Sequence, residues 1–352
     1  MTLIYFILVL GVIVLVHEFG HFMFAKLFGV HVYEFSIGMG PKIWGTKPKK
    51  NKTTYNIRAI PIGGFVQLAG EEVDDDEKID KDKKLYNKPI WQRFLIMFFG
   101  AGNNFILAFL ILFFVGLFTG SYNMDPVVTK LDEKYPMYQA GIRVNDEILE
   151  VNGKKISTVD DVKVYMTLAS EKAEETTFKV LRDNKELEFK VTPVKEETDG
   201  VVAYKYGIIF ELEKETGFVN AIKYAFLKIG ALIKQMFIVL GSLFTGKLGL
   251  GNMSGPVGIY SIVGETAKTG FISLLHLVVA LSVNVGFLNL IPFPAFDGGR
   301  LLFLIIEKIK GSPVSPKVEN TIHSIGFVLL MILILVITCN DVFKLIGKLF
   351  KF

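Results

Sequence analysis

The chain has 352 residues, of which 51% are hydrophobic and 31 are Phe, and its mean hydropathy is +0.43. These values are high for a soluble protein and favour a membrane protein with room for more than one domain. The net charge is only +4 and the basic residues are scattered without interleaved aromatic side chains, which excludes a nucleic-acid partner from the expected functions. Cys339 is the single cysteine, so no disulfide can form within the chain.

Residues 3–16 form an unbroken apolar run that ends directly before His17, Glu18 and His21. The run lacks the basic start and the small-residue cleavage site of a signal peptide, so we expect it to be retained as a membrane span. A bilayer-spanning helix needs ~20 mostly apolar residues. Three later segments provide that length, namely 94–118, 274–306 with interruptions, and 325–337 extended toward Phe343. The sequence therefore predicts a polytopic α-helical membrane protein with about four transmembrane helices.

Basic residues are concentrated in two of the connecting loops. The loop at 26–93 and the loop before the last span carry Lys42, Lys47, Lys49, Lys50, Lys52, Arg58, Lys308, Lys310 and Lys317. The positive-inside rule therefore places both loops in the cytoplasm and puts the N-terminus and residues 120–217 outside. The C-terminal tail also falls outside although it carries Lys344, Lys348 and Lys351, which is a minor conflict with the rule.

The N-terminal membrane part, residues 1–119, also contains a segment with β character. YNIRAIPIGGFVQLAGE predicts two short strands about Gly63-Gly64, giving a membrane-associated β-hairpin over about residues 54–69. The acidic stretch that follows, residues 71–84, has no apolar periodicity. We interpret it as a solvated loop, not as a metal site.

Residues 120–200 have the composition of a small soluble domain inserted between membrane parts. Short alternating strands, turns at Asn152-Gly153 and Asp183-Asn184, and one helical stretch from about Val159 predict a β-rich domain.

Residues 201–270 are expected to connect this domain to the C-terminal membrane part, residues 271–352. Segment 218–244 within them is a candidate fifth span, but its lysines Lys223, Lys228 and Lys234 follow one another at intervals of five and six residues. We therefore favour a long amphipathic helix that lies at the membrane or against the helix bundle.

The sequence VHEFGHFMF at residues 16–24 carries the first chemical signal. Residues four apart share a helix face, so His17 and His21 can present both imidazoles to one metal ion while Glu18 stands beside them. Zinc is the first choice for such ligands, although iron and cobalt suit them nearly as well. The motif also occurs by chance in long sequences. Ionisable groups inside a span are costly, however, and three within five residues are typical of a functional site.

A third ligand has to come from another part of the chain, and Asp297 in NLIPFPAFDGGR at 289–300 is the candidate. Pro292 and Pro294 remove backbone donors and break the helix, and Gly298-Gly299 is expected to loosen it further. Broken backbone at membrane depth suits a water-filled site that receives an unwound substrate. Without the histidines, a kinked span with one buried aspartate would instead suggest an ion path.

With these motifs the sequence resembles the site-2 protease family of intramembrane zinc metalloproteases, and most closely the bacterial regulator-of-sigma-E protease group. HEFGH matches the family's HExxH, and NLIPFPAFDGG matches its NxxPxPxxDGG. PIGGFVQLAGE resembles the membrane-associated β-hairpin of the family, and NMSGPVGI at 252–259 resembles its SGPxGI stretch. YQAGIRVNDEILEVNG resembles part of a PDZ domain, and the chain has room for one such domain.

For the metal site, the resemblance implies one zinc ion and three ligands: His17, His21 and Asp297. It further implies that Glu18 is the general base and that Asn289 is a catalytic polar group near the substrate or the developing oxyanion. GAGNNF resembles the family's GPxxNF with Ala101 in place of proline, and implies that Asn104 lies near the site. In the PDZ-like stretch, Val144-Asn145 replaces the usual Pro-Gly, but asparagine tolerates a left-handed turn.

The resemblance implies regulated intramembrane proteolysis of single-pass transmembrane proteins in the lipid bilayer of the bacterial cell (inner) membrane, by a multi-pass enzyme. A substrate helix must unwind before its peptide bonds can be attacked. We expect the edge of the hairpin to bind it as an added strand, with Gly64, Phe65 and Val66 in contact. The PDZ-like domain at 120–200, expected outside the cytoplasm, would bind a peptide ligand and act as a substrate filter.

Two functions from other classes compete with this interpretation. In a membrane metal transporter, the intramembrane histidines and Asp297 would pass an ion and Glu18 would relay protons. The sequence contains no repeated or inverted half of the kind that transporters use, which argues against this function. In an inactive membrane scaffold, only the PDZ-like domain would bind partners, and the retained Glu18 argues against that.

Overall fold

In the computed structural model, the chain divides into two units, one of residues Met1–Ile111 with Gly249–Phe352 and the other of Leu112–Leu248. The structure describes residues 1–46, 52–71, 79–170, 174–198, 201–211, 213–246, 248–249, 251 and 253–350. Four of our sequence interpretations fall partly outside these residues: the basic positions Lys47, Lys49 and Lys50, half of the acidic stretch at 71–84, Asn252, and Lys351 in the C-terminal tail.

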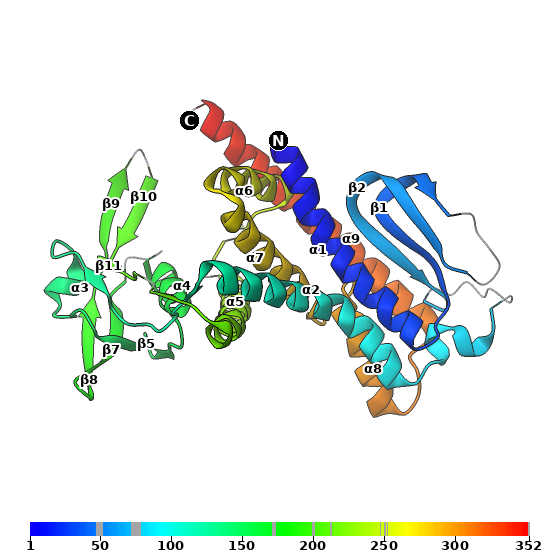
Figure 1. The fold of residues 1–352 in the computed structure, drawn as a ribbon, viewed down its shortest axis with the longest axis horizontal. Helices are drawn as coiled ribbons and strands as arrows, with labels where there is room; N and C mark the ends of the chain where they lie inside the picture. The colour runs from blue at the N-terminus through cyan, green and yellow to red at the C-terminus, as the bar shows by residue number, and fades with distance from the viewer. Residues whose placement is uncertain are drawn as a thin grey trace. The chain divides into compact units, whose positions relative to one another are not determined.

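Helices make up most of the first unit (Figure 1). They are α1 Thr2–Leu27, α2 Ile90–Thr119, which continues into the second unit, α6 Pro256–Thr269, α7 Phe271–Leu290, α8 Asp297–Lys310 and α9 Pro316–Phe350. Two short 3-10 turns, Lys81–Lys83 and Leu85–Asn87, precede α2. A helix that is apolar on all sides is suited to lipid.

Five helices in the described part of the chain are long and apolar enough to cross a membrane: α1, α2, α7, α9 and, in the second unit, α5 Phe218–Phe244. The protein is therefore a polytopic α-helical membrane protein. The sequence predicted about four spans and left 218–244 as an uncertain fifth candidate.

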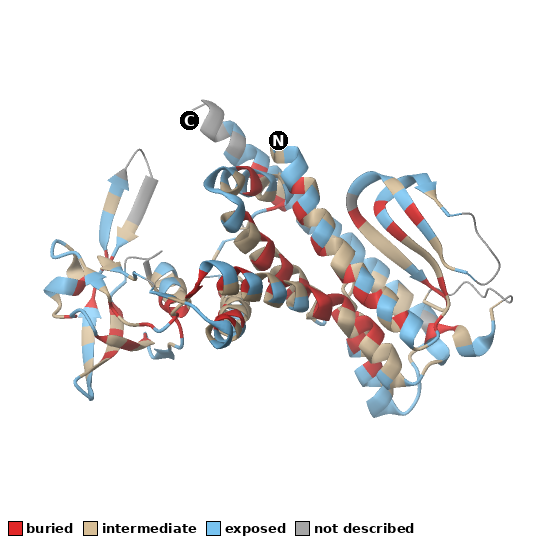
Figure 2. Ribbon diagram, viewed as in Figure 1, coloured by how far each residue is buried: buried red, intermediate tan, exposed pale blue. Residues whose placement is uncertain are grey.

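The interior of the helical unit forms where α1, α6 and α7 meet. Phe6, Val9 and Ile13 on α1 pack with Val263 on α6 and with α7 at Leu274 and Val278. A second cluster joins the end of α1 to the start of α2 and to α8. Figure 2 shows buried positions gathered along α2 and α7 and on one side of α1. This packing holds the ends of α1, α7 and α8 close together.

The β structure beside α1 is larger than the hairpin that we predicted. Strand β1 Val32–Gly45 pairs antiparallel with one continuous strand, β2 Thr54–Leu68, so Gly63-Gly64 is not the turn between two strands. Ser36 pairs with both Phe65 and Asn56, which means that the start of β1 lies between the two ends of β2. Gly63 has φ +84°, a left-handed conformation that lets the strand bend at this point. The Gly-Gly pair therefore bends one strand, and the turn that we predicted from it was wrong.

The second unit contains a four-stranded antiparallel sheet in the order β6-β5-β7-β8. After the end of α2, the elements of this unit in chain order are β3 Ser121–Tyr122, β4 Lys130–Leu131, α3 Pro136–Gln139, β5 Glu147–Val151, β6 Lys154–Lys155, α4 Val159–Ser170, β7 Thr176–Arg182, β8 Lys185–Val191, β9 Val194–Thr198, β10 Val201–Lys205, β11 Ile208–Ile209, β12 Lys214–Glu215 and α5. Phe178, Met137 and Ile148 are fully buried in its core.

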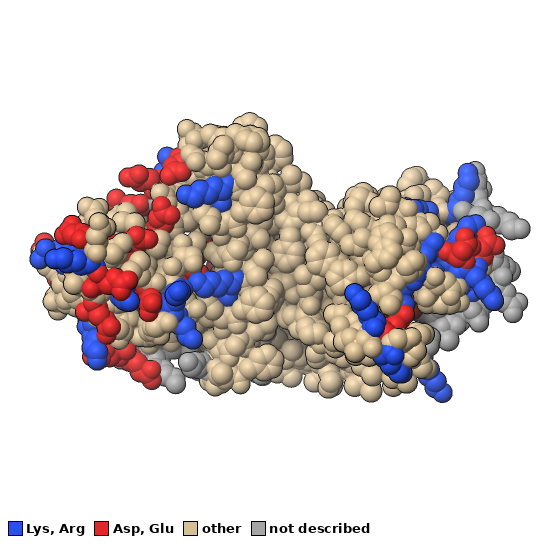
Figure 3. Space-filling view, turned by 90° about the horizontal axis from the view of Figure 1, so that it is seen from below, with Lys and Arg blue, Asp and Glu red and all other residues tan. Residues whose placement is uncertain are grey.

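The turns of this unit follow the sequence prediction closely. Asn152, Asp183 and Asn184 all have positive φ, as turn residues between strands require. Asn145 has φ +71°, which is the left-handed conformation that asparagine was expected to tolerate there. Figure 3 shows Lys, Arg, Asp and Glu gathered over this unit, in contrast to the mostly uncharged face of the helices.

Candidate metal centre and active site

Two histidines on one face of α1 form the first half of the candidate site. His17 and His21 are 8% and 7% exposed, and their rings meet edge to face with centroids 4.9 Å apart. The four-residue spacing stacks them on one side of the helix. Buried imidazoles in an apolar helix need partners, and those partners come from other helices.

The loop between α7 and α8 supplies the second half. The predicted helix interruption is present: α7 ends at Leu290, and α8 begins at Asp297, beyond Pro292 and Pro294. Asp297 is the first residue of α8, where the helix dipole favours a carboxylate. The prediction that the next two glycines loosen this segment was wrong. A Cβ at Gly298 would lie 2.2 Å from the Ile291 carbonyl oxygen, so this glycine allows tight packing of the loop.

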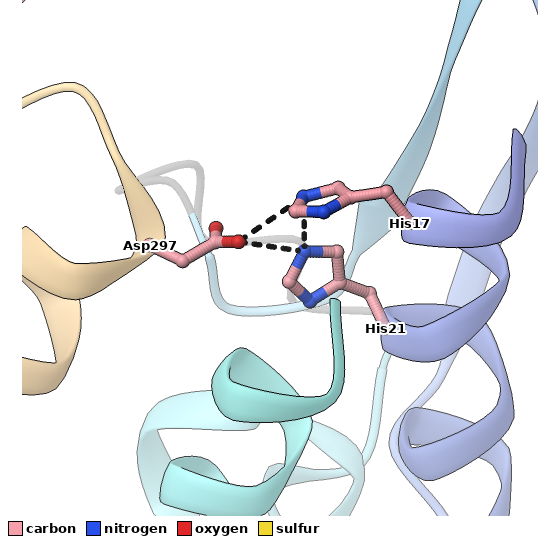
Figure 4. A group of neighbouring side chains, drawn as sticks. All are labelled: His17, His21 and Asp297. Carbon is pink, nitrogen blue, oxygen red and sulfur yellow. Dashed lines mark hydrogen bonds and ion pairs between the residues drawn. The ribbon is translucent and has the colours of Figure 1, made fainter. Parts of the chain in front are cut away.

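The three side chains converge on one point (Figure 4). Asp297 Oδ2 lies 3.1 Å from His17 Nε2 and 3.2 Å from His21 Nε2, and the two Nε2 atoms are 3.3 Å apart. Ligands bound tetrahedrally at ~2.0–2.1 Å from zinc lie ~3.3 Å from one another. Apart from these imidazoles, the buried Asp297 Oδ2 has no polar partner among the described residues. The donor set, its spacing and the orphaned oxygen all fit one zinc ion.

Backbone and side-chain groups of α2 orient both imidazoles. His21 Nδ1 donates to the Ile96 carbonyl at 2.9 Å, which places the proton on Nδ1 and leaves the Nε2 lone pair for a metal. His17 Nδ1 lies 3.4 Å from the side-chain nitrogen of Asn104.

The amide of Asn104 fits better when it is turned by 180°. Its oxygen, Oδ1, is buried and has no hydrogen-bond partner among the described residues. Exchanging the amide nitrogen and oxygen would let Oδ1 accept a proton from His17 Nδ1, which the metal-binding tautomer requires. The structure thus places Asn104 behind a candidate ligand, and no described contact places it against a substrate.

Two glycines, one in HEFGH and one in GAGNNF, to which the sequence analysis gave no role of their own, allow α1 and α2 to approach. A Cβ on Gly100 would lie 2.2 Å from His21 Nε2, and one on Gly20 would lie 1.9 Å from the Phe99 carbonyl oxygen. Any side chain at either position would separate the helices. The spacing of small residues in FFGAG could have suggested a close helix contact, but not its partner.

Glu18 does not belong to the converging ligand atoms but faces the sheet. Its Oε2 accepts a hydrogen bond of 3.1 Å from the backbone N–H of Val66 on β2. A Cβ added at Gly64 would lie 3.7 Å from Glu18 Cγ and only 2.7 Å from the Ser36 carbonyl oxygen. The structure therefore brings Glu18, Gly64 and Val66 together beside the metal centre.

An ion pair holds strand β2 to strand β1. Arg58 lies 4.7 Å from the Phe65 ring and forms a 2.6 Å salt bridge to Glu34. Burial alone would raise the pKa of Glu34, but hydrogen bonds from Asn56, Ser36 and Arg58 outweigh it and hold this pKa below its usual range. Glu34 therefore stays ionised and anchors the sheet that carries Phe65.

Asn289 and His323 complete the surroundings of the loop. The side chain of Asn289 donates to the Val285 carbonyl of its own helix at 3.0 Å, and no described contact joins it to the three candidate ligands. His323 on α9 accepts a 3.2 Å hydrogen bond from the backbone N–H of Ala295, which has φ +89°. A histidine to which the sequence assigned no role thus binds the strained residue two positions before Asp297.

Comparison with known proteins identifies the family. The family model "Peptidase family M50" matches residues 5–333. The chain belongs to this family, that of the site-2 proteases. It is 38% identical over 350 residues to a Fusobacterium nucleatum protein that is named as a zinc metalloprotease. The alignment covers 99% of this chain and all of that protein.

Two named relatives from Bacillus agree with the M50 assignment. The chain is 33% identical to the regulator of sigma-W protease RasP of Bacillus subtilis, covering 98% of this chain and 99% of the relative. It is 32% identical to the zinc metalloprotease RasP of Bacillus licheniformis, with the same coverage. This M50 peptidase is therefore an intramembrane zinc metalloprotease, and zinc is its cofactor, so the iron and cobalt left open by ligand type do not apply.

Proposed function

We propose that this M50 peptidase performs regulated intramembrane proteolysis, hydrolysing peptide bonds within transmembrane segments of short single-span membrane proteins. Anti-sigma factors and signal-peptide remnants are the substrates that we expect. The name of the B. subtilis relative, a regulator of a sigma factor, supports the first of these classes. The observation that carries the proposal is the convergence of His17, His21 and Asp297 beside a carboxylate that is bonded to a strand.

His17, His21 and Asp297 would hold the zinc ion. When bound, zinc lowers the pKa of water toward ~7 and polarises a peptide carbonyl. The hydrogen bond from His21 Nδ1 to the Ile96 carbonyl keeps the His21 ring in the metal-binding tautomer. A hydrogen bond from His17 Nδ1 to the Asn104 side chain would do so for the His17 ring. These contacts supply the rigid support that a metal centre needs.

Glu18 would act as the general base. Its carboxylate is placed next to the ligands by the one-residue offset from His17, so it can take a proton from the attacking water and deliver it to the leaving amine. The Val66 N–H stabilises the charged carboxylate in this place. Asn289 would donate to the developing oxyanion after its side chain leaves the Val285 carbonyl.

Segment 64–68 of β2 would receive the unwound substrate. Only one side of this segment pairs with β1, and the Val66 N–H points the other way, toward Glu18. An extended substrate strand added there would have its backbone groups paired while a peptide bond lies beside the base. Gly64, Phe65 and Val66 are the residues that we assign to this contact.

The β-rich domain would filter substrates as a PDZ-like domain. A cavity of about 450 Å³ is lined by residues of α4, including Met166, and by the segment around Gly207 and Ile208. Strand β11 pairs with β4 on one edge, and no described strand pairs with its other edge, where we propose that an extended peptide binds. We place this domain on the extracytoplasmic side by the positive-inside rule.

Glu18→Gln tests the function directly. This variant keeps the side-chain shape and leaves the three candidate ligands intact, so the purified protein should still contain one zinc per chain. Cleavage of a single-span reporter reconstituted with it should fall ~10²- to 10⁴-fold, which is ~3–5 kcal/mol of transition-state stabilisation. His21→Ala should lose both zinc and cleavage. Preserved cleavage by Glu18→Gln would remove Glu18 from the mechanism. Membership of the M50 family already argues against the transporter and the scaffold.

A further inference from the structure

Helix α8 carries a charged side chain one turn beyond the third candidate ligand. Arg300 follows Asp297 by three residues, so the two side chains lie on one face of the helix. The Arg300 guanidinium forms a 2.5 Å salt bridge to Glu71, and the two side chains are 28% and 24% exposed. In the sequence Glu71 reads as part of a solvated loop, but in the structure it is paired with α8.

Glu71 lies just beyond the strand segment to which we assign the substrate. Strand β2 ends at Leu68, three residues before Glu71, and the proposed substrate segment is 64–68. The salt bridge therefore joins the end of this segment to the helix whose first residue is Asp297. The strand that would hold the substrate is in this way linked to a candidate zinc ligand.

A second ion pair holds the other end of α8 to the helices of the metal centre. Arg93 on α2 donates to both carboxylate oxygens of Glu307 at 3.0 and 2.8 Å, and these side chains are 15% and 14% exposed. Three residues after Arg93, the Ile96 carbonyl accepts the Nδ1 proton of His21. Helices α8, α2 and α1 are thus bonded to one another without the help of β2, so α8 can keep its place when its contact to β2 is removed.

The other polar contact between β2 and the site lies on the edge that the substrate would use. The Val66 N–H donates to Glu18 and points away from β1. In the function that we propose, an added substrate strand pairs with the backbone groups of this edge. This contact therefore competes with the substrate and cannot by itself fix the position of the loaded strand.

The salt bridge between Arg300 and Glu71 lies outside segment 64–68, so a substrate strand bound there does not displace it. Leu68 and Leu301 also belong to one apolar cluster that joins β2 to α8. Apolar packing is non-directional, however, and allows small sliding movements. A charge-assisted hydrogen bond from a rigid guanidinium fork fixes both distance and direction.

We propose that Arg300 is a positioning residue that sets the register of the bound substrate strand against the zinc ion and so selects the peptide bond that is cut. The inference rests on the proposed function of segment 64–68. A strand advances ~3.3 Å per residue, so a shift of β2 along α8 by that distance brings a neighbouring peptide bond to the metal centre. The link from Arg300 to Glu71 prevents this shift.

Mapping of cleavage sites tests the inference in the complete zinc-loaded enzyme, reconstituted in vesicles of phosphatidylethanolamine and phosphatidylglycerol. The probe is a single-span reporter whose transmembrane segment contains a run of alanines. Neighbouring peptide bonds in this run are chemically equal, so the geometry of the enzyme decides which one is cut. Products of the wild type, Arg300→Gln, Glu71→Gln and the double variant are identified by mass spectrometry, and zinc per chain is measured on the same samples.

The wild type should cut mainly one bond of the alanine run. Arg300→Gln and Glu71→Gln should each raise the share of products cut at other bonds at least threefold, with unchanged zinc. The double variant should cut no more widely than either single variant, because all three lack the same contact. Arg300→Lys keeps the charge on a more flexible chain and should lie between the wild type and Arg300→Gln.

Glu319→Gln is the matched control. Glu319 on α9 also attracts the Arg300 charge but does not join it to β2, so this variant should cut at the same bond as the wild type. A control that spreads the products as widely as Arg300→Gln would mean that the charge balance around Arg300, and not its link to Glu71, selects the bond.

Four further results would overturn the inference. They are an unchanged product pattern in both single variants, a double variant whose spread equals the sum of the two, a wild type that cuts several bonds equally, and loss of zinc from Arg300→Gln, which would mean that Arg300 supports Asp297 instead. A wild type that holds zinc but leaves the reporter uncut would contradict the proposed function, and this inference with it. A wild type that cuts, with variants that cut alike, would contradict this inference alone.

Discussion

The backbone N–H of Val66 donates a 3.1 Å hydrogen bond to Glu18 Oε2, joining the edge of the β1–β2 sheet to the carboxylate of the HExxH motif. A donor on a charged acceptor is worth ~1.5–3 kcal/mol. The same N–H lies on the side of the strand that an incoming peptide would pair with. In the function that we propose, one short segment of backbone therefore both positions the base and binds the substrate.

Val66→Pro should impair cleavage because proline removes this N–H. Loss of a hydrogen bond of ~1.5–3 kcal/mol predicts a fall in kcat/KM of ~10- to 100-fold, measured on a reconstituted single-span reporter. Val66→Ala retains the N–H and should keep kcat/KM within ~3-fold. Zinc content should not change in either variant. A Val66→Pro enzyme with wild-type cleavage would disprove both roles of this edge.

Gly100→Ala should destroy the metal centre. The new Cβ would lie 2.2 Å from His21 Nε2, so either the ring or α2 must move. We expect less than a tenth of the zinc per chain found in the wild type, measured by elemental analysis after gel filtration. Gly102→Ala is the matched control, because its Cβ would meet only phenylalanine side chains at 3.2 Å or more. Equal zinc in the two variants would show that this close contact is not required.

Asn104 variants should separate hydrogen bonding from packing. Asn104→Asp keeps an oxygen that can accept the His17 Nδ1 proton, whereas Asn104→Leu keeps the volume but has no acceptor. Partners behind metal ligands contribute ~10- to 100-fold in metal affinity. We expect a loss of that size for Asn104→Leu and a much smaller change for Asn104→Asp, measured by competition with a chelator. Identical affinities would exclude a contact to His17.

Loss of the ion pair between α4 and α5 should loosen α4, and exchanging the two charged residues should restore it. Asp160→Lys leaves Lys228 facing a like charge, and Asp160→Lys with Lys228→Asp restores an opposite pair. The single variant should speed amide hydrogen exchange in α4, and the double variant should return it toward the wild-type rate. No change in the single variant would show that this pair does not hold α4.

Local patterns in the sequence predicted those features that depend on neighbouring residues. The spacing of His17 and His21 predicted a shared helix face, and their Nε2 atoms lie 3.3 Å apart. Pro292 and Pro294 predicted the break between α7 and α8, because proline removes backbone donors. The turn at Asn152 followed in the same way from the tolerance of asparagine for positive φ.

Features that depend on distant contacts were not predictable from one sequence. Gly63-Gly64 reads locally as a turn, but β1 pairs with both ends of β2, so the glycine bends a strand instead. Position 100 requires glycine only because His21, 79 residues earlier, packs against it. In the same way, His323 binds the loop at Ala295 only because α9 lies against that loop, and the local sequence does not indicate this contact.

That loop gives a final prediction, because Ala295 has φ +89° and is held there by the hydrogen bond from its N–H to His323. A non-glycine residue in this conformation costs about 1–3 kcal/mol. Ala295→Gly should therefore keep zinc and activity and raise the melting temperature, whereas the β-branched Ala295→Val should displace Asp297 and lose most of its zinc. Zinc content and melting curves of the two variants check this. Full zinc in Ala295→Val would show that the position of Asp297 does not depend on this backbone conformation.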